Sequence, residues 1–278
     1  EPKPGFKAEV IGSYETHNTF DKNANISYRK NNFYSSIFFN NFSSNGYDLV
    51  EDDGLNTVNK FRNNTLQIKL RKDISEKINI KINARYFAQL IDNIAPNNLT
   101  GETFTAEDNI NLIINHNSDK FKTDFEIYYT SYFGDEFLND DQGNRFSESF
   151  YDQILVKPEI KTVYKVDMQK EFVFGMGYIY ETLNRTFFDN KPKQNSPFIY
   201  FQYDFYPTEK INLIFGGRFD KFEEYKSQFS PKFSGIFEIN NNESIKFSAG
   251  YGYKTPDFRQ LYFNFSNSSV GYSVIGYN

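Results

Sequence analysis

The sequence contains no cysteine and no tryptophan, and it has only two histidines and two methionines among 278 residues. Without cysteine, neither a disulfide framework nor a cysteine-ligated zinc site can form. No stretch approaches the roughly 18 consecutive apolar residues that a membrane-spanning helix needs, which excludes a bundle of such helices. Basic residues are not in excess either, since 31 of them face 36 acidic ones for a net charge of −5. A nucleic-acid partner therefore has no electrostatic support.

Aromatic residues are abundant, by contrast. The chain carries 32 phenylalanines and 21 tyrosines, which make up 19% of the sequence, although its mean hydropathy is only −0.66. Disordered chains are poor in aromatic residues, so this composition excludes disorder. What remains is a large β structure that is polar on one side and aromatic on the other.

Period-two alternation supports this interpretation. Apolar residues at even positions alternate with Asn, Lys and Arg over residues 78–86, and similar patterns cover 229–239 and 245–254. Because successive side chains of a strand point to opposite faces, each segment has one apolar face and one polar face. The alternation predicts fourteen strands, at 6–18, 24–30, 33–42, 64–73, 78–90, 108–116, 121–133, 151–166, 172–184, 197–206, 211–221, 228–239, 245–256 and 269–278.

The connections between these strands differ in length at the two ends of the predicted sheet. Tight turns are expected at 30–32, 74–78, 117–120, 167–171, 207–210 and 240–244. Most connections between them are long and polar, namely 43–63, 91–107, 134–150 and 185–196. Short turns on one side and long loops on the other are typical of outer-membrane barrels. We therefore predict an all-β fold, an antiparallel transmembrane β-barrel, closed because lipid cannot satisfy an open sheet edge. The alternative, a soluble β-sandwich, would have similar turns at both ends and a more apolar inward face.

The two ends of the chain suggest a segment of a longer protein. The sequence begins at Glu1 without a methionine or a signal segment, and Asn278 directly follows a strand-like run.

Three stretches carry a resemblance to a known family. They are Glu1-Pro-Lys-Pro-Gly-Phe-Lys-Ala-Glu-Val-Ile-Gly-Ser-Tyr-Glu-Thr, then Ser43-Ser44-Asn45-Gly46-Tyr47-Asp48-Leu49, and finally Gly217-Arg218-Phe219-Asp220 through Phe229-Ser230-Pro231-Lys232-Phe233 to Ser248-Ala249-Gly250-Tyr251-Gly252-Tyr253-Lys254-Thr255-Pro256-Asp257-Phe258-Arg259-Gln260-Leu261-Tyr262. In order and character they resemble the barrel of TonB-dependent outer-membrane receptors, and the Asn-, Lys- and aromatic-rich style is similar to receptors of the Bacteroidetes.

The resemblance implies a barrel of 22 strands in the outer membrane of a Gram-negative bacterium. Residues 1–278 would be one partial barrel domain of about 14 strands, beginning just after the plug and lacking the C-terminal strands. Implied partners are outer-membrane lipid, the plug domain, the TonB complex and a scarce nutrient such as siderophore-bound iron, haem, cobalamin or an oligosaccharide. The resemblance implies a transporter, not an enzyme, and no cofactor.

Candidate site residues follow from strand position and residue type. Aromatic and basic residues on or beside the outer loops are candidates for ligand binding: Tyr47, Tyr132, Phe133, Phe137, Arg259, Tyr262 and Phe263. The aromatic ones could equally serve as membrane-interface residues. Arg218, Asp220 and Lys254 are expected to face the lumen or the plug, or simply to form a charge ladder that keeps the lumen wet.

Metal ligation and catalysis have weaker candidates. Asp140 and Asp141 lie in an oxygen-rich segment, 139–144, that suits calcium, but solvated loop charge is the favoured explanation, because acidic pairs at loop tips need no ligand to be stable. His17 and His116 have no partner at ligand spacing. Two alternative functions stay open: a self-contained fourteen-stranded porin or fatty-acid channel, and a barrel hydrolase using His116 with Ser118.

Overall fold

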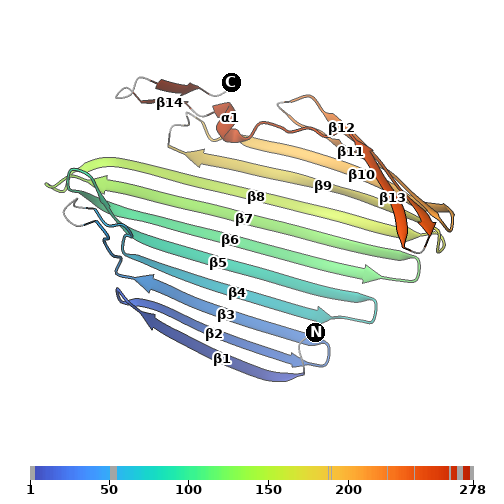
Figure 1. Cartoon of the computed structure of the whole chain (residues 1–278), viewed down its shortest axis with the longest axis horizontal. Coiled ribbons are helices and arrows are strands. Elements are labelled where there is room, and N and C mark those ends of the chain that lie inside the picture. Colours follow the sequence, from blue (N-terminus) through green and yellow to red (C-terminus); the bar gives the residue numbers. More distant parts are fainter. Residues whose placement is uncertain are drawn as a thin grey trace.

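The computed structural model describes residues 4–50, 55–186, 188, 190–223, 225–240, 242–262, 264–267 and 272–275. Thirteen consecutive strands form one antiparallel sheet in sequence order, each paired with its neighbours in the chain (Figure 1). They are β1 (Gly5–Glu15), β2 (Thr19–Lys30), β3 (Phe33–Ser44), β4 (Phe61–Asp73), β5 (Ile78–Ala95), β6 (Leu99–Asn117), β7 (Phe121–Asn139), β8 (Arg145–Lys165), β9 (Lys170–Arg185), β10 (Lys193–Thr208), β11 (Ile211–Asp220), β12 (Gln228–Asn240) and β13 (Glu243–Gly250).

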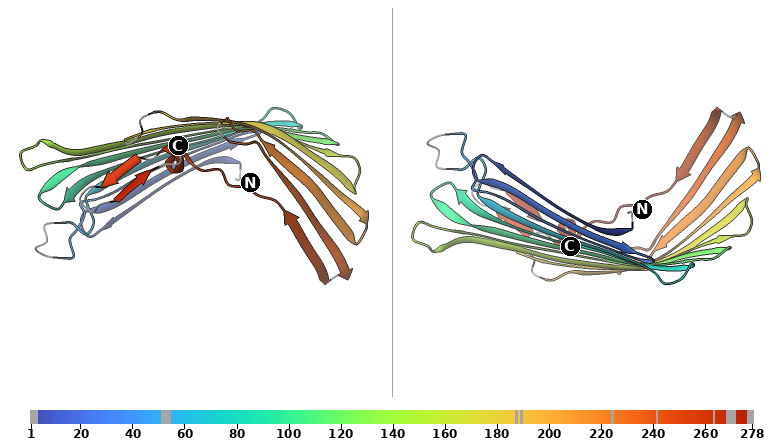
Figure 2. Two further views of the ribbon diagram at one scale, coloured as in Figure 1. Left: turned by 90° about the horizontal axis from the view of Figure 1, so that it is seen from above. Right: turned by 90° about the horizontal axis from the view of Figure 1, so that it is seen from below.

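A short helix and a hairpin follow the sheet. They are α1 (Phe258–Tyr262), β14 (Asn264–Asn267) and β15 (Tyr272–Ile275). The sheet is curved like a trough, and α1 lies inside the curve (Figure 2). No helix in the described part of the chain is long and apolar enough to cross a membrane. The predicted all-β antiparallel architecture is confirmed, with the sheet open between β1 and β13.

Alternation sorts the side chains between the two faces of the sheet. On β10, for example, Ile199 and Phe201 lie on the convex face and are 54% and 47% exposed. Phe198 lies on the opposite, concave face of the same strand and is buried. One row of cross-strand partners on the convex face is aromatic in six successive strands. Its members are Phe121, Tyr164, Phe172, Tyr203, Phe215 and Phe233. Several rings stack, with centroids 4.4 Å apart between Phe172 and Tyr203. An exposed aromatic and aliphatic belt of this kind suits contact with lipid.

Two of the predicted long loops are wrong. Residues 91–107 are mostly strand, because β5 runs to Ala95 and β6 starts at Leu99, with a turn that places Asn97 and Asn98 at positive φ. Residues 134–150 are likewise mostly strand, since β7 and β8 are 19 and 21 residues long. The reason is that both faces are polar here. Once the convex face carries residues such as Glu102, alternation no longer reveals a strand.

The fourteenth strand, predicted at 269–278, does not join the large sheet. Tyr272–Ile275 pairs with Asn264–Asn267 in a separate two-stranded sheet, and the other residues of 269–278 lie outside the described residues. The thirteenth strand also ends at Gly250 instead of residue 256. The following segment contains Pro256, which cannot donate a hydrogen bond to a neighbouring strand.

The strands are strongly staggered. One row of cross-strand partners on the concave face passes through Arg29, Tyr34, Arg71, Lys81, Ile113, Glu126, Glu159, Gly177, Phe198 and Asp220. It starts beside the tight turn after β2 and ends at the last residue of β11, at the long-loop end of the strands (Figure 1). A row that climbs in this way means that the strands tilt, as barrel strands must.

Candidate functional site

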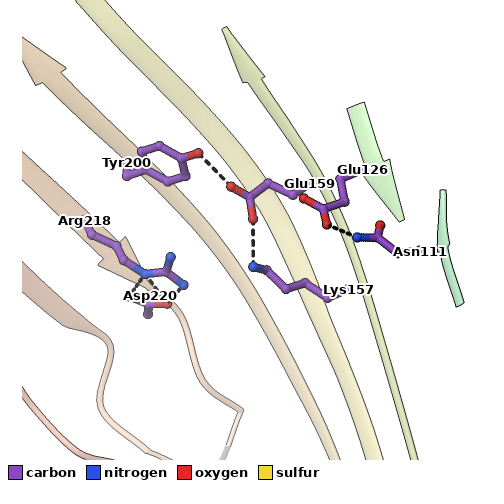
Figure 3. A network of polar contacts seen from close by, with 7 residues as sticks. All are labelled: Asn111, Glu126, Lys157, Glu159, Tyr200, Arg218 and Asp220. Atoms are coloured by element: carbon purple, nitrogen blue, oxygen red, sulfur yellow. Dashed lines mark hydrogen bonds and ion pairs between the residues drawn. The ribbon is translucent and has the colours of Figure 1, made fainter. Parts of the chain in front are cut away.

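The concave face carries a polar cluster where β8 and β10 flank β9. The Tyr200 hydroxyl donates to Glu159 Oε1 at 2.7 Å, and Lys157 Nζ lies 2.8 Å from Glu159 Oε2 (Figure 3). Because Lys157 and Glu159 are two residues apart on one strand, both point to the same face. The Glu159 carboxylate thus links β8 to β10 across β9 by a charge-assisted hydrogen bond.

Arg218 and Asp220 form the second part of this cluster. The guanidinium donates to both carboxylate oxygens, with Nε–Oδ2 at 2.8 Å and Nη2–Oδ1 at 2.7 Å (Figure 3). The Asp220 side chain is only 4% exposed, and Arg218 also lies over the ring of Phe198, 3.9 Å from its centroid. The Gly217-Arg218-Phe219-Asp220 motif thus sends its two charges to the concave face and Phe219 to the convex one.

Two glycines of β9 make room for the aromatic rings of β10. A side-chain carbon added to Gly175 or Gly177 would collide with the ring of Tyr200 or Phe198 respectively. The two rings are nearly parallel, with centroids 6.3 Å apart. The rings therefore lie flat over the backbone of β9 and fill the space that the two glycines, which have no side chain, leave open.

A ladder of amides and carboxylates continues this face across β5–β7. Asn115 donates to Asp124 at 2.6 Å, and Asn111 donates to Glu126 at 2.8 Å (Figure 3). Further toward the long-loop end, Arg85 Nη1 lies 2.9 Å from Glu107 Oε2. These cross-strand contacts keep the face hydrated and fix the strand register.

A third group gathers at the long-loop end of β7–β9. The Tyr151 hydroxyl donates to Gln153 Oε1 at 2.7 Å, and the Gln153 amide donates to Glu181. Tyr132 packs edge-on against Tyr151, with centroids 5.4 Å apart, and the Arg185 guanidinium lies 5.6 Å from the Tyr151 ring centroid. Most of these side chains line one groove on the concave face. Aromatic rings with a few aimed polar groups are the usual composition of a ligand pocket.

The three aromatic candidates of β7 point in two directions. Tyr132 belongs to the groove, but Phe133, the next residue, faces the convex side and contacts Phe104 with centroids 6.3 Å apart. Phe137 lies on the convex side as well, beneath the Arg145 guanidinium at 3.9 Å. The structure therefore brings only Tyr132 of these three to the groove.

Tyr47 lies in a compact loop after β3. Its ring packs against His17 with centroids 4.8 Å apart, and its backbone pairs with Val58. Gly46 has a φ of +76° and no room for a side chain, because the Val58 carbonyl approaches too closely. Asp48 accepts hydrogen bonds from the backbone of Val50 and from Thr57. The Gly46-Tyr47-Asp48-Leu49 motif therefore has a local structural role.

The C-terminal candidates lie around α1. Tyr262 contacts Phe188 with centroids 6.2 Å apart, and Lys254 is exposed in the irregular segment between β13 and α1. The backbone of Arg259 is within α1, whereas its side chain and Phe263 lie outside the described residues. Only Tyr262 of this set has a described aromatic contact.

The calcium candidates occupy the turn between β7 and β8. Asp140 accepts hydrogen bonds from the backbone of Gln142 and Asn144 and from the Asn144 amide. These bonds, led by that of the Asn144 side chain, hold the pKa of the Asp140 carboxyl below its ordinary value. The carboxylate thus closes its own turn. No group of three or more potential metal-ligating acidic or histidine side chains occurs among the described residues.

Sequence reasoning missed Tyr151, Gln153 and Arg185. Tyr151 and Gln153 stand at the predicted start of a strand, and Arg185 stands in a predicted loop. Extending the alternation back from Glu159 places residues 157, 155, 153 and 151 on one face, so the signal was present in the strand period.

Comparisons with known proteins agree with this geometry. The family model described as TonB dependent receptor-like, beta-barrel matches residues 6–278. The iron-regulated outer membrane virulence protein of Vibrio cholerae serotype O1 is 29% identical over 69 residues, which are 25% of this chain and 11% of that protein.

Solved structures share the fold. The FrpB iron transporter from Neisseria meningitidis superposes with a TM-score of 0.73 at 12% identity, covering 91% of this chain and 48% of that one. The siderophore receptor PirA from Acinetobacter baumannii gives 0.69 at 12% identity, covering 94% and 45%. The chain thus spans about half the length of these receptors. With its family match over nearly all residues, the chain belongs to the TonB-dependent receptor β-barrel family and resides in the outer membrane of a Gram-negative bacterium.

Proposed function

We propose that this barrel wall is part of a receptor that binds a scarce nutrient at the cell surface and imports it in a step energised through TonB. One observation carries the proposal. The concave groove at the long-loop end holds Tyr132, Tyr151, Gln153 and Arg185 on rigid strands, where a ligand arriving from outside meets them first. Rigid strands position binding groups more accurately than loops do.

The proposal includes the domain assignment. Residues 1–278 act as barrel wall, and a plug domain elsewhere in the receptor contacts the concave face, including the surroundings of Arg218, Asp220 and Lys254. Family membership supports this assignment, as does a concave face that carries polar groups over its whole height. Iron bound to a carrier molecule is the first nutrient to test, because the relatives described above include an iron transporter and a siderophore receptor.

The alternative functions have less support. A self-contained fourteen-stranded pore requires closure, whereas thirteen strands form the described sheet and leave β1 and β13 as edges. For a hydrolase, Ser118 would need activation. Its hydroxyl instead lies 3.2 Å from both the carbonyl and the amide of Phe121, which closes the turn before β7.

The test is uptake by cells that carry the full-length receptor. Iron-starved cells with the wild-type receptor should accumulate radiolabelled iron chelate, and deletion of TonB should reduce the uptake to background. Tyr151→Ala should lower uptake at least tenfold at equal receptor abundance, because it removes a ring and a hydrogen bond from the groove. The matched control is Phe146→Ala, which removes an aromatic ring that is 66% exposed outside the groove. Uptake that persists without TonB would contradict the proposal.

A further inference from the structure

The charges on the concave face are distributed unevenly along the strands. We define the outer concave wall as the four rows of cross-strand partners nearest the long-loop end of β5–β9. These rows are Phe87–Glu107–Tyr132–Gln153–Leu183, Gln89–Thr105–Gly134–Tyr151–Arg185, Ile91–Thr103–Glu136–Ser149 and Asn93–Gly101–Leu138–Ser147. Amides, hydroxyls and phenols dominate this wall, which contains no lysine.

Positive charge is scarce on the outer concave wall. Arg185 is its only cation, and the guanidinium lies over the rings of Tyr151 and Phe188 at 5.6 and 5.8 Å. Of the two acids, Glu107 is paired with Arg85 at 2.9 Å, and Glu136 is exposed. The wall therefore offers an approaching ligand one arginine against two carboxylates and no excess of positive charge.

Basic residues elsewhere do not compensate. Lys81, Lys157 and Lys161 stand on the same face but nearer the tight turns, below the outer rows. At the long-loop end, Lys60 is 2.7 Å from Asp92 and Lys191 is 3.9 Å from Asp152, and both acids lie on the convex face. These two lysines are thus directed away from the groove.

The polar groups of the wall are instead arranged for neutral hydrogen bonding. Asn93 donates to Thr103 at 2.6 Å, and Gln89 donates to Asn63 at 3.0 Å. Each of these residues keeps further donor or acceptor capacity, because an amide or a hydroxyl can make more than one hydrogen bond. Tyr132 and Tyr151 add ring faces and edges against which a flat or ring-shaped group can stack.

We infer that the outer concave wall accepts a ligand without net negative charge that is dense in hydroxyl and amide groups, an inference that rests on the proposed receptor function. A polyanionic chelate needs several aimed guanidinium or ammonium groups, and one arginine beside Glu136 does not supply them. An uncharged ligand needs no lysine and can form hydrogen bonds with the amides and phenols of the wall. A neutral ferric trihydroxamate and a neutral oligosaccharide both have this chemistry.

The first experiment compares three probes on the purified full-length receptor in zwitterionic nanodiscs. Calorimetry measures the affinity for ferrichrome, a neutral ferric trihydroxamate, for maltoheptaose, a neutral oligosaccharide, and for a ferric tris-catecholate of charge −3. One neutral probe should bind at least tenfold tighter than the tris-catecholate, with an affinity that changes less than about twofold between about 50 and 500 mM NaCl. The neutral probe that binds shows whether the ligand is a ferric hydroxamate or an oligosaccharide. A tris-catecholate that binds at least as tightly as both neutral probes overturns the inference.

The second experiment changes the charge of the wall. Glu136→Lys should raise the affinity for the tris-catecholate by roughly tenfold, because it places a cation in the groove. Asp141→Lys makes the same charge change at an exposed loop tip and should leave that affinity unchanged. Equal effects of the two variants would overturn the inference. These binding measurements need no TonB, so a failure of energised uptake would count against the proposed function and leave the ligand class standing.

Discussion

Two regions of this sheet, β5–β8 and β9–β11, are held together differently. In β5–β8, strands of 18 to 21 residues are joined by half-exposed amide and carboxylate contacts, such as Asn111–Glu126 and Arg85–Glu107. In β9–β11, strands of 10 to 16 residues are joined by rings over glycines and by one ion pair with a buried carboxylate. Many weak contacts tolerate single losses. A few strongly coupled ones do not.

The largest expected effect is at Asp220. Asp220→Ala should destabilise the barrel by about 2–3 kcal/mol, because it removes a buried carboxylate together with its bidentate hydrogen bonds from the Arg218 guanidinium, which is 37% exposed. The measurement is the temperature at which the folded full-length receptor loses its fast-migrating band on unheated gels. Asp73→Ala is the control, since the Arg71–Asp73 pair is 39% and 38% exposed and should contribute less than about 1 kcal/mol.

The double variant Arg218→Ala with Asp220→Ala sharpens this comparison. It should recover part of the stability lost in Asp220→Ala, because no uncompensated charge remains. Equal destabilisation by the Asp220 and Asp73 variants would show that burial of the carboxylate does not strengthen the Arg218–Asp220 pair.

The second prediction concerns the glycines under the rings. Gly177→Ala should cost about 1–3 kcal/mol, because the new methyl group collides with the Phe198 ring and with the Pro158 carbonyl. Gly12→Ala on β1 is the control, since nothing lies within 4 Å of the added carbon. The same gel assay measures both variants. An unchanged melting temperature for Gly177→Ala would mean that the ring moves aside at no cost.

The third prediction addresses the ladder of β5–β8. Glu107→Gln should cost only about 0.5 kcal/mol, because the Arg85–Glu107 pair is 38% and 34% exposed and water screens it. The loss should shrink further when the melting curves are repeated at high salt. A loss of stability comparable to that of Asp220→Ala would mean that the contacts of β5–β8 are as strong as those of β9–β11.

The smallest effect is at the Asp140 turn. Because its folded-state pKa is lowered, the contribution of Asp140 to the turn is fully present above the ordinary carboxyl value of 3.8 and is lost as the pH falls through the lowered pKa. Titration of the receptor carrying ¹³C-labelled aspartate should therefore give an Asp140 midpoint below 3.8. Asn144→Ala should raise that midpoint, because it removes the largest lowering contribution. An unchanged Asp140 midpoint in the Asn144→Ala variant would mean that another interaction lowers the pKa of Asp140.

The sequence predicted the fold best where water and lipid lie on opposite faces. Residues 78–86 alternate cleanly because one face is apolar, and β5 was found there. Residues 91–95 and 99–107 extend the same hairpin but carry polar side chains on both faces, so the strand period left no trace and a loop was predicted. Alternation records a difference between two environments and disappears when both are wet.

The candidate site was predicted less completely for a related reason. Tyr132 and Phe133 were chosen together as loop aromatics, although adjacent residues of a strand must point to opposite faces. Arg185 and Tyr151 become neighbours only through the register between β8 and β9, which no local pattern specifies. Asp220 is buried and interacts with Tyr253, which lies 33 residues later in the chain, so this contact is equally non-local.

The stagger of the strands sets the path that a row of neighbouring residues follows along the inner wall. The row from Arg29 to Asp220 crosses nine strand spacings of about 4.8 Å and advances about one residue per strand, which corresponds to a tilt of about 35°. Neighbours along this row therefore differ in depth, and its two ends are separated by about 25 Å of height, comparable to the apolar band of such barrels. The row therefore winds around the inner wall as it rises, so that its successive residues lie at different heights and in different directions around the barrel axis.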